Sequence, residues 1–222
     1  MQVSPPRLVP SPKDIFREYV PDEFCRELTR IIIRDYQRAD TLCDEQFAAQ
    51  EAHDARPHVR RAYIEQDVRN AARRFTEMAA SVPPNVTNNS YHTEIRAGRV
   101  VLTVSAVDNP ETIVREARFR LGYAGEWQSA MPFMEQDDVQ PMSERSVYAI
   151  AIHGPNPHDR KLPGFIHIAF PVPDCSTYLA GRIDLLSEYP DILGEFGGPE
   201  IIVPPTIYLR DGAVPSDASQ DT

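Results

Sequence analysis

The spacing of apolar residues changes once along this chain, and that change constrains the fold more than any other feature. Between residues 22 and 80, apolar side chains recur every three or four positions, which is the spacing of amphipathic helices. From Tyr91 onward, apolar and polar residues alternate instead, which is typical of strands with one buried face. Helices that come first and strands that follow indicate the α+β class.

The first part of the chain is predicted to be an extended arm followed by a helical hairpin. Residues 1–11 are rich in proline, which favours an extended conformation. The range 12–81 is predicted to contain a short helix and then two long antiparallel helices. The second long helix is expected to run from Pro57 to about Ala80, because proline is favoured in the first turn of a helix. We expect this hairpin to form one domain with the residues that follow.

Residues 91–209 are predicted to form a mainly antiparallel sheet of about five strands, with two further helices. Ala97 and Gly98 are expected to form the tight turn of the first strand pair, with Arg96 opposite Arg99. The expected strands are 91–96, 99–107, 147–153, 165–171 and 201–209. The expected helices are 109–121 and 174–189. The predicted fold is therefore α+β, with the helical hairpin packed on the sheet.

Two segments have no regular period. Residues 122–145 contain Trp127, two prolines and an acidic patch, and they are expected to form a long irregular excursion. Residues 210–222 form an acidic tail that is expected to be disordered.

Two of the expected strands, 147–153 and 165–171, each have a bulky face and a smaller face that includes a histidine. The two histidines are His153 and His167. If the strands pair antiparallel, both histidines lie on one face, about 5–8 Å apart. They are then the candidate catalytic residues, able to act as general base and general acid.

The loop between these strands adds three candidate binding residues, which are His158, Asp159 and Arg160. Two or three histidines with an aspartate are able to hold a divalent metal ion, which lowers the pKa of a bound water. The alternative is structural: His153 bonds to the backbone at the end of its strand, His167 packs beneath a helix, and the loop is a solvated turn. The spacing matches no specific metal motif. We therefore expect no cofactor, or a divalent metal if the protein is an enzyme.

Two further groups are candidate binding residues. His92 belongs to the polar face of the first strand pair, and it lines the same cleft as His153 if both strand pairs share a sheet; the alternative is a solvent-exposed face. Arg115, Arg118 and Arg120, near Trp127, are suited to clamp a phosphate or carboxylate with paired hydrogen bonds. The alternative there is the basic outer face of an amphipathic helix.

Composition and missing motifs narrow the function. The net charge of −10 argues against nucleic acid as a partner. No run of about 18 apolar residues is present, so we expect no membrane-spanning helix. Three widely spaced cysteines favour a reducing compartment and therefore a cytoplasmic location. The sequence patterns of phosphate-binding loops, dinucleotide sites, esterases and zinc proteases are absent, which argues against those classes of protein.

We therefore expect an acidic, cytoplasmic protein-binding or regulatory factor without catalytic activity. Its partner is expected to be a protein, and a basic one if it complements the net charge. The first alternative is a histidine-dependent hydrolase or phosphodiesterase, with or without a metal. The second alternative is a structural component of a viral or mobile-element assembly, in which the extended termini become ordered against neighbouring subunits. The sequence leaves the oligomeric state open.

Overall fold

The computed structural model describes residues 10–84, 91–128 and 146–197 of the chain. Its helices are α1 (Pro12–Tyr19), α2 (Asp22–Gln46), α3 (Ala49–Ala72), α4 (Arg118–Gln128), α5 (Leu185–Glu188) and α6 (Pro190–Glu195). Its strands are β1 (Met78–Ser81), β2 (Glu94–Ala97), β3 (Val100–Ala106), β4 (Val147–Pro155), β5 (Pro163–Ala169) and β6 (Ile183–Asp184). The predicted strand at 201–209, the tail at 210–222, residues 1–9 of the predicted arm and residues 129–145 of the predicted excursion lie outside the described residues. Residues 122–128 of that excursion belong to α4, so the prediction that they are irregular is wrong.

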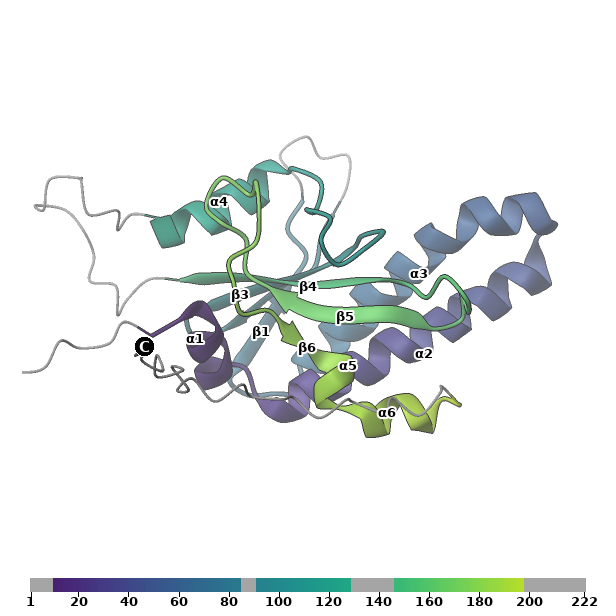
Figure 1. Cartoon of the computed structure of the whole chain (residues 1–222), viewed down its shortest axis with the longest axis horizontal. Helices are drawn as coiled ribbons and strands as arrows, with labels where there is room; N and C mark the ends of the chain where they lie inside the picture. Colours follow the sequence, from purple (N-terminus) through teal and green to yellow (C-terminus); the bar gives the residue numbers. More distant parts are fainter. Residues whose placement is uncertain (1–9, 85–90, 129–145, 198–222) are drawn as a thin grey trace, which may run out of the picture.

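The helical hairpin consists of α2 and α3, which lie side by side and extend past the sheet (Figure 1). α2 buries one broad apolar face, and side chains such as Phe24, Leu28 and Ile32 are fully buried. α3 begins at Ala49 and passes through Pro57. The prediction of a helix from Pro57 to about Ala80 is therefore wrong at both ends. Proline favours the first turn of a helix but does not require it, and the chain leaves α3 at Ala72 to form β1 at Met78–Ser81.

All six strands form one sheet in chain order, from β1 to β6. Four of the five pairings are antiparallel, and the pairing of β3 with β4 is parallel. The predicted α+β class, with a mainly antiparallel sheet and a packed helical hairpin, is confirmed. The sheet is mixed because the chain between β3 and β4 crosses over one face and includes α4, so β4 enters in the same direction as β3 (Figure 1).

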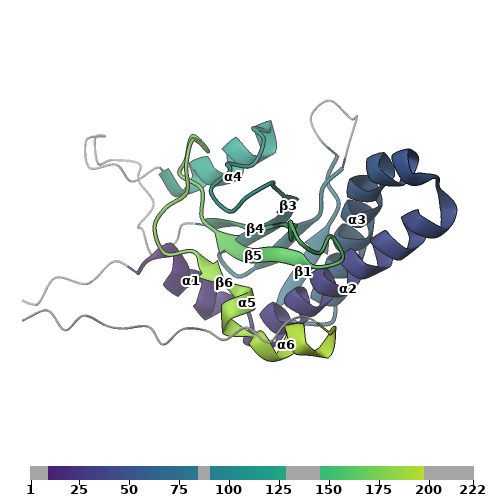
Figure 2. The ribbon, with the colours of Figure 1, turned by 45° about the vertical axis from the view of Figure 1, so that its right-hand side comes forward.

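The sheet separates two layers. One face packs against α1, α2, α3, α5 and α6, and its buried side chains include Leu102, Ile166 and Ile168. The other face carries Tyr148 and Ile150 and is covered by α4 and the neighbouring loops. Figure 2 shows α4 on one side of the sheet and α1, α5 and α6 on the other. Helices on both faces explain why β4 is buried along nearly its whole length.

Two predicted helices are wrong for a common reason. The helix expected at 109–121 begins only at Arg118, and in its first residues the Asn109 side chain instead accepts from the N–H groups of Glu111 and Thr112, each at 3.0 Å, which forms a turn. The helix expected at 174–189 is replaced by a turn in which Asp174 accepts from Ser176, followed by β6 and two short helices. Asn and Asp side chains form such turns as readily as they cap helices, so the sequence alone did not separate the two outcomes.

The first strand pair has the predicted faces but a different register. Ala97 pairs with Val100, and Gly98 and Arg99 form the turn between them. The predicted pairing of Arg96 with Arg99 is therefore wrong, but the observed register leaves the side chains that do pair, from Ile95 to Leu102, on their predicted faces. Residues 91–93, predicted as part of the strand, precede β2 and do not pair with β3. Gly98 has a φ of +51°, a left-handed conformation in which glycine carries no steric penalty.

Candidate functional site

β3 pairs with β2 only along the first half of its length. The last pair between β2 and β3 is Ile95 with Leu102. The residues that precede β2 lie along α3 instead, where the Thr93 hydroxyl donates to the Glu65 carbonyl at 3.1 Å. The second half of β3 still pairs with β4, up to Ala106 opposite His153. Among the paired strands of the structure, this half of β3 therefore has a free edge on the β2 side.

A cleft of about 690 Å³ opens along this free edge. Its walls are α3 on one side and the segment 115–120 on the other, with His92 and the second half of β3 between them. The volume lies within the usual range for ligand-binding clefts. The residues that line it are Pro57, His58, Arg61, Ile64, Glu65, His92, Thr103, Val104, Ser105, Ala106, Arg115, Glu116, Ala117, Arg118, Phe119, Arg120 and His153.

The lining contains four arginines but only two glutamates. Arg61 and Glu65 neutralise each other through an ion pair of 2.7 Å. Arg120 donates to the Arg115 carbonyl at 2.7 Å and to the Ser105 hydroxyl at 3.3 Å, and these contacts hold the 115–120 segment against β3. This leaves three arginines against Glu116, so the cleft is locally basic although the chain is acidic.

The wall formed by residues 115–120 also contains an aromatic stack. His92 stacks on Phe119 with ring centroids 3.7 Å apart and an interplanar angle of 10°. Burial lowers the pKa of His92, and only the neighbouring Glu94 works in the opposite direction. The imidazole of His92 is therefore uncharged at neutral pH, and it supplies a flat surface to the cleft.

His153 closes the cleft on the hairpin side of the sheet. Its Nδ1 lies 2.9 Å from the hydroxyl oxygen of Tyr36, and both side chains are buried. The guanidinium of Arg60 lies over the Tyr36 ring, 3.8 Å from its centroid. Burial, and secondarily the charge of Arg60, lowers the pKa of His153 to about 3. His153 is therefore a neutral hydrogen-bonding group at pH 7 and a weak proton acceptor.

His167 does not join this site. β4 and β5 pair with Ile152 opposite His167 and His153 opposite Ile166, so the two histidines point to opposite faces of the sheet. The prediction that they share a face is wrong. Each strand alternates as predicted, but the register decides which faces coincide, and a shift of one residue reverses that choice.

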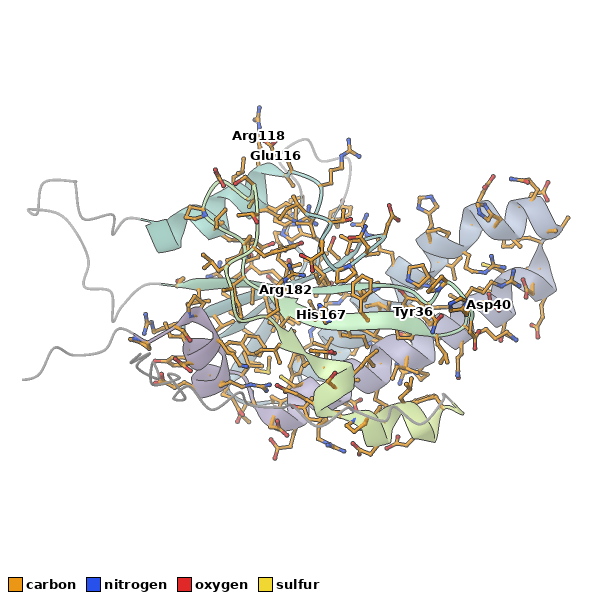
Figure 3. All side chains as sticks on the ribbon, in the orientation of Figure 1. Tyr36, Asp40, Glu116, Arg118, His167 and Arg182 are labelled. Carbon is orange, nitrogen blue, oxygen red and sulfur yellow. The ribbon has the colours of Figure 1, made fainter. Side chains whose placement is uncertain are left out.

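On its own face, His167 has the carboxylate of Asp184 3.9 Å from its Nε2. Figure 3 shows His167 and Arg182 close together near the middle of the sheet, away from Glu116 and Arg118 at the rim of the α4 layer. Burial lowers the pKa of His167, with Asp184 opposing the shift.

The loop between β4 and β5 is tied to the hairpin instead of the cleft. The Asn156 side chain accepts from the N–H groups of His158 at 2.9 Å and Asp159 at 3.4 Å, which fixes a turn. Arg160 forms ion pairs of 2.8 Å with Asp40 and with Asp44 of α2. None of the three candidates from this loop lines the cleft.

Most of the remaining predicted binding residues line the cleft. Arg118 and Arg120 line the cleft, as does His92, which joins His153 there because both strand pairs belong to one sheet. Trp127 lies in α4, but its side chain falls outside the described residues. The sequence did not single out Phe119 or Glu65, because the departure of β2 from β3 leaves no sequence signal.

Two searches of the described part of the chain were negative. In residues 10–84, 91–128 and 146–197, no cluster of three or more His, Cys, Asp or Glu side chains is placed to hold a metal ion. In the same ranges, no helix has both the length and the apolar character needed to cross a bilayer. No protein family, curated protein or solved structure matches this chain significantly.

Proposed function

We propose that this protein is a non-catalytic binding protein that holds an anionic ligand in the cleft at the free edge of β3. The observation that carries the proposal is the set of arginines in the lining, of which Arg115 and Arg118 are exposed. Among the described residues, no carboxylate lies within ion-pair distance of either guanidinium. Free guanidinium groups at the rim of a cleft bind carboxylates and phosphates through paired, charge-assisted hydrogen bonds.

The chemistry of the cleft supports binding over catalysis. An efficient general base has a pKa near the working pH, and His153 is far from that value at about 3. His167, the second residue of the histidine mechanism, lies on the other face of the sheet. The hydrolase alternative therefore loses the histidine pair on which it rested.

The proposed ligand is anionic, whereas the net charge of −10 favoured a basic partner. A ligand inside the cleft interacts mainly with charges within about 8–10 Å, because salt screens more distant ones. Those nearby charges are mostly arginines. The alternative of a subunit in an assembly rests on the chain termini, which lie outside the described residues.

We further propose a cytoplasmic location. Its support is that Cys25, Cys43 and Cys175 are all buried and free, so the fold depends on no disulfide and suits a reducing compartment.

The test is an NMR titration of the ¹⁵N-labelled full chain with inorganic phosphate and with capped tetraglutamate. We expect shifts at Ser105, Arg115 and Arg118 that saturate and that weaken as salt is added. Arg26 and Arg30 serve as internal controls, because they pair with acidic residues of α6. Absence of cleft shifts with both anions, or equal shifts at Arg26 and Arg30, would count against the proposal.

A further inference from the structure

The direction of the backbone groups in β3 follows from two hydrogen bonds to and from β4. The Val147 N–H donates to the Arg99 carbonyl at 2.7 Å, and the Val107 N–H donates to the His153 carbonyl at 2.9 Å. Within a strand, successive residues direct their N–H and C=O groups to opposite sides. Odd-numbered residues of β3 therefore bond to β4, and Val104 and Ala106 direct their backbone groups into the cleft.

Within the described part of the chain, these backbone groups have no backbone hydrogen-bond partner. β2 pairs with β3 only as far as Leu102. Val104 is half-buried and Ala106 is exposed. No backbone hydrogen bond joins Val104 or Ala106 to the described segment that turns away along α3. An unpaired strand edge inside a cleft is the geometry in which an extended peptide adds to a sheet.

The two walls of the cleft differ in chemistry. On one side of the sheet plane, Ser105 contacts Arg120, which in turn contacts the Arg115 backbone. The exposed Arg115 and Arg118 line the same wall of the cleft. On the other side, the apolar lining consists of Val104 and Ala106 from β3 with Pro57 and Ile64 from α3, and the charged α3 residues Arg61 and Glu65 neutralise each other. Side chains of an added strand point alternately to these two sides. Acidic residues then face the arginines while apolar residues face α3.

We propose that the ligand is an extended polypeptide segment of alternating acidic and apolar residues, which adds to the free edge of β3 as a further strand. The inference rests on the proposed anion-binding cleft and names the class of ligand. The backbone of the segment pairs with Val104 and Ala106, and its carboxylates bind the arginines of the 115–120 segment. Backbone pairing supplies affinity, and the alternation supplies specificity.

The experiment measures amide hydrogen exchange by NMR at Val104 and Ala106 in the full chain, with and without two capped hexapeptides. The first peptide alternates, Glu-Val-Glu-Val-Glu-Val, and the second has the same composition in blocks, Glu-Glu-Glu-Val-Val-Val. In the free protein these two amides should exchange much faster than those of Thr103 and Ser105, which face β4. The alternating peptide should slow their exchange by roughly tenfold or more at saturation, and the block peptide should not.

The outcomes separate the two proposals. If both peptides shift Arg115 and Arg118 but neither protects Val104 and Ala106, strand addition is overturned and the anion-binding cleft stands. Slow exchange of Val104 in the free protein also overturns strand addition, because the edge is then already paired. If neither peptide nor phosphate perturbs the cleft, both proposals fall.

Discussion

At the residue scale, the same side chain has different roles depending on its partners. Arg56 and Arg160 both contact the buried carboxylate of Asp40, each at 2.8 Å, so they fasten the hairpin to the β4–β5 loop. Arg115 and Arg118 line the cleft, and among the described residues no carboxylate lies within ion-pair distance of either one. Figure 3 shows Arg118 at the outer rim of the α4 layer, far from Asp40. The density of arginines along the chain did not distinguish these roles; ion pairing in three dimensions does.

A residue-scale prediction concerns pH and His153, whose pKa is lowered to about 3 in the folded chain. Below about pH 6.5 the unfolded chain takes up a proton on this imidazole and the folded chain does not, so stability falls as pH decreases toward 3. We expect His153→Gln to reduce the slope of unfolding free energy against pH, between pH 6 and 4, by up to about 1.4 kcal/mol per pH unit. The measurement is urea unfolding at a series of pH values.

Other titrating groups remain in both proteins and cancel in this comparison. They include His92 and His167, which act in the same direction, and Asp35, whose raised pKa of about 6 acts in the opposite direction. The control is His158→Gln, which removes an exposed imidazole from the turn between β4 and β5 and leaves the buried imidazole of His153 in place. Equal slopes for wild type and His153→Gln would show that His153 is accessible to protons in the folded chain.

At the element scale, the cleft exists because β2 is short and its preceding residues follow α3. The β2–β3 turn fixes where the pairing starts, and it depends on Gly98. A Cβ at this position would overlap the ring of Tyr19 at the end of α1. The β2–β3 turn and the docking of α1 are therefore coupled through Gly98.

The element-scale prediction is that Gly98→Ala destabilises the fold by on the order of 2–4 kcal/mol, from the left-handed backbone and the overlap with Tyr19. Gly122→Ala is the matched control. Gly122 is an exposed helical position in α4, and a Cβ there would have no neighbour within 4 Å. The control should gain about 0.5–1 kcal/mol from helix propensity. Chemical denaturation measures both, and an unchanged Gly98→Ala midpoint would refute this account of the turn.

Much of the architecture could be predicted at this scale, and the reasons for the failures are physical. The period of apolar residues identified α2, the β2–β3 pair and the β4–β5 pair, because burial of one face dictates that period. The register between β4 and β5 is set by the loop and by an irregularity at Gly154 and Pro155, neither of which has a sequence period. The prediction that His153 and His167 share a face of the sheet was wrong for this reason.

The candidate site was predictable only in part. His92, Arg118 and Arg120 were selected for their chemistry, and they do line one cleft with His153. The cleft itself depends on where β2 leaves β3, which is a tertiary event. Sequence reasoning had no means to find Phe119 or the free edge of Val104, because neither is distinguished by residue type or spacing.

At the scale of the whole molecule, charge is distributed unevenly. The chain carries a net charge of −10, yet the cleft gathers four arginines. The net negative charge of the chain repels polyanions such as nucleic acid at long range, while a short acidic segment that reaches the cleft meets an attractive local field. The account therefore predicts selectivity for short anions over long ones.

The most direct test of the anion-binding cleft is the affinity of capped tetraglutamate, measured by isothermal titration calorimetry on three proteins. These are the wild type, the double variant R115E/R118E, and the double variant R69E/R73E, which changes net charge equally at arginines that do not line the cleft. The account predicts at least a roughly tenfold loss of affinity for R115E/R118E and no more than about a twofold loss for R69E/R73E. Equal losses in both variants, or none in either, would contradict it.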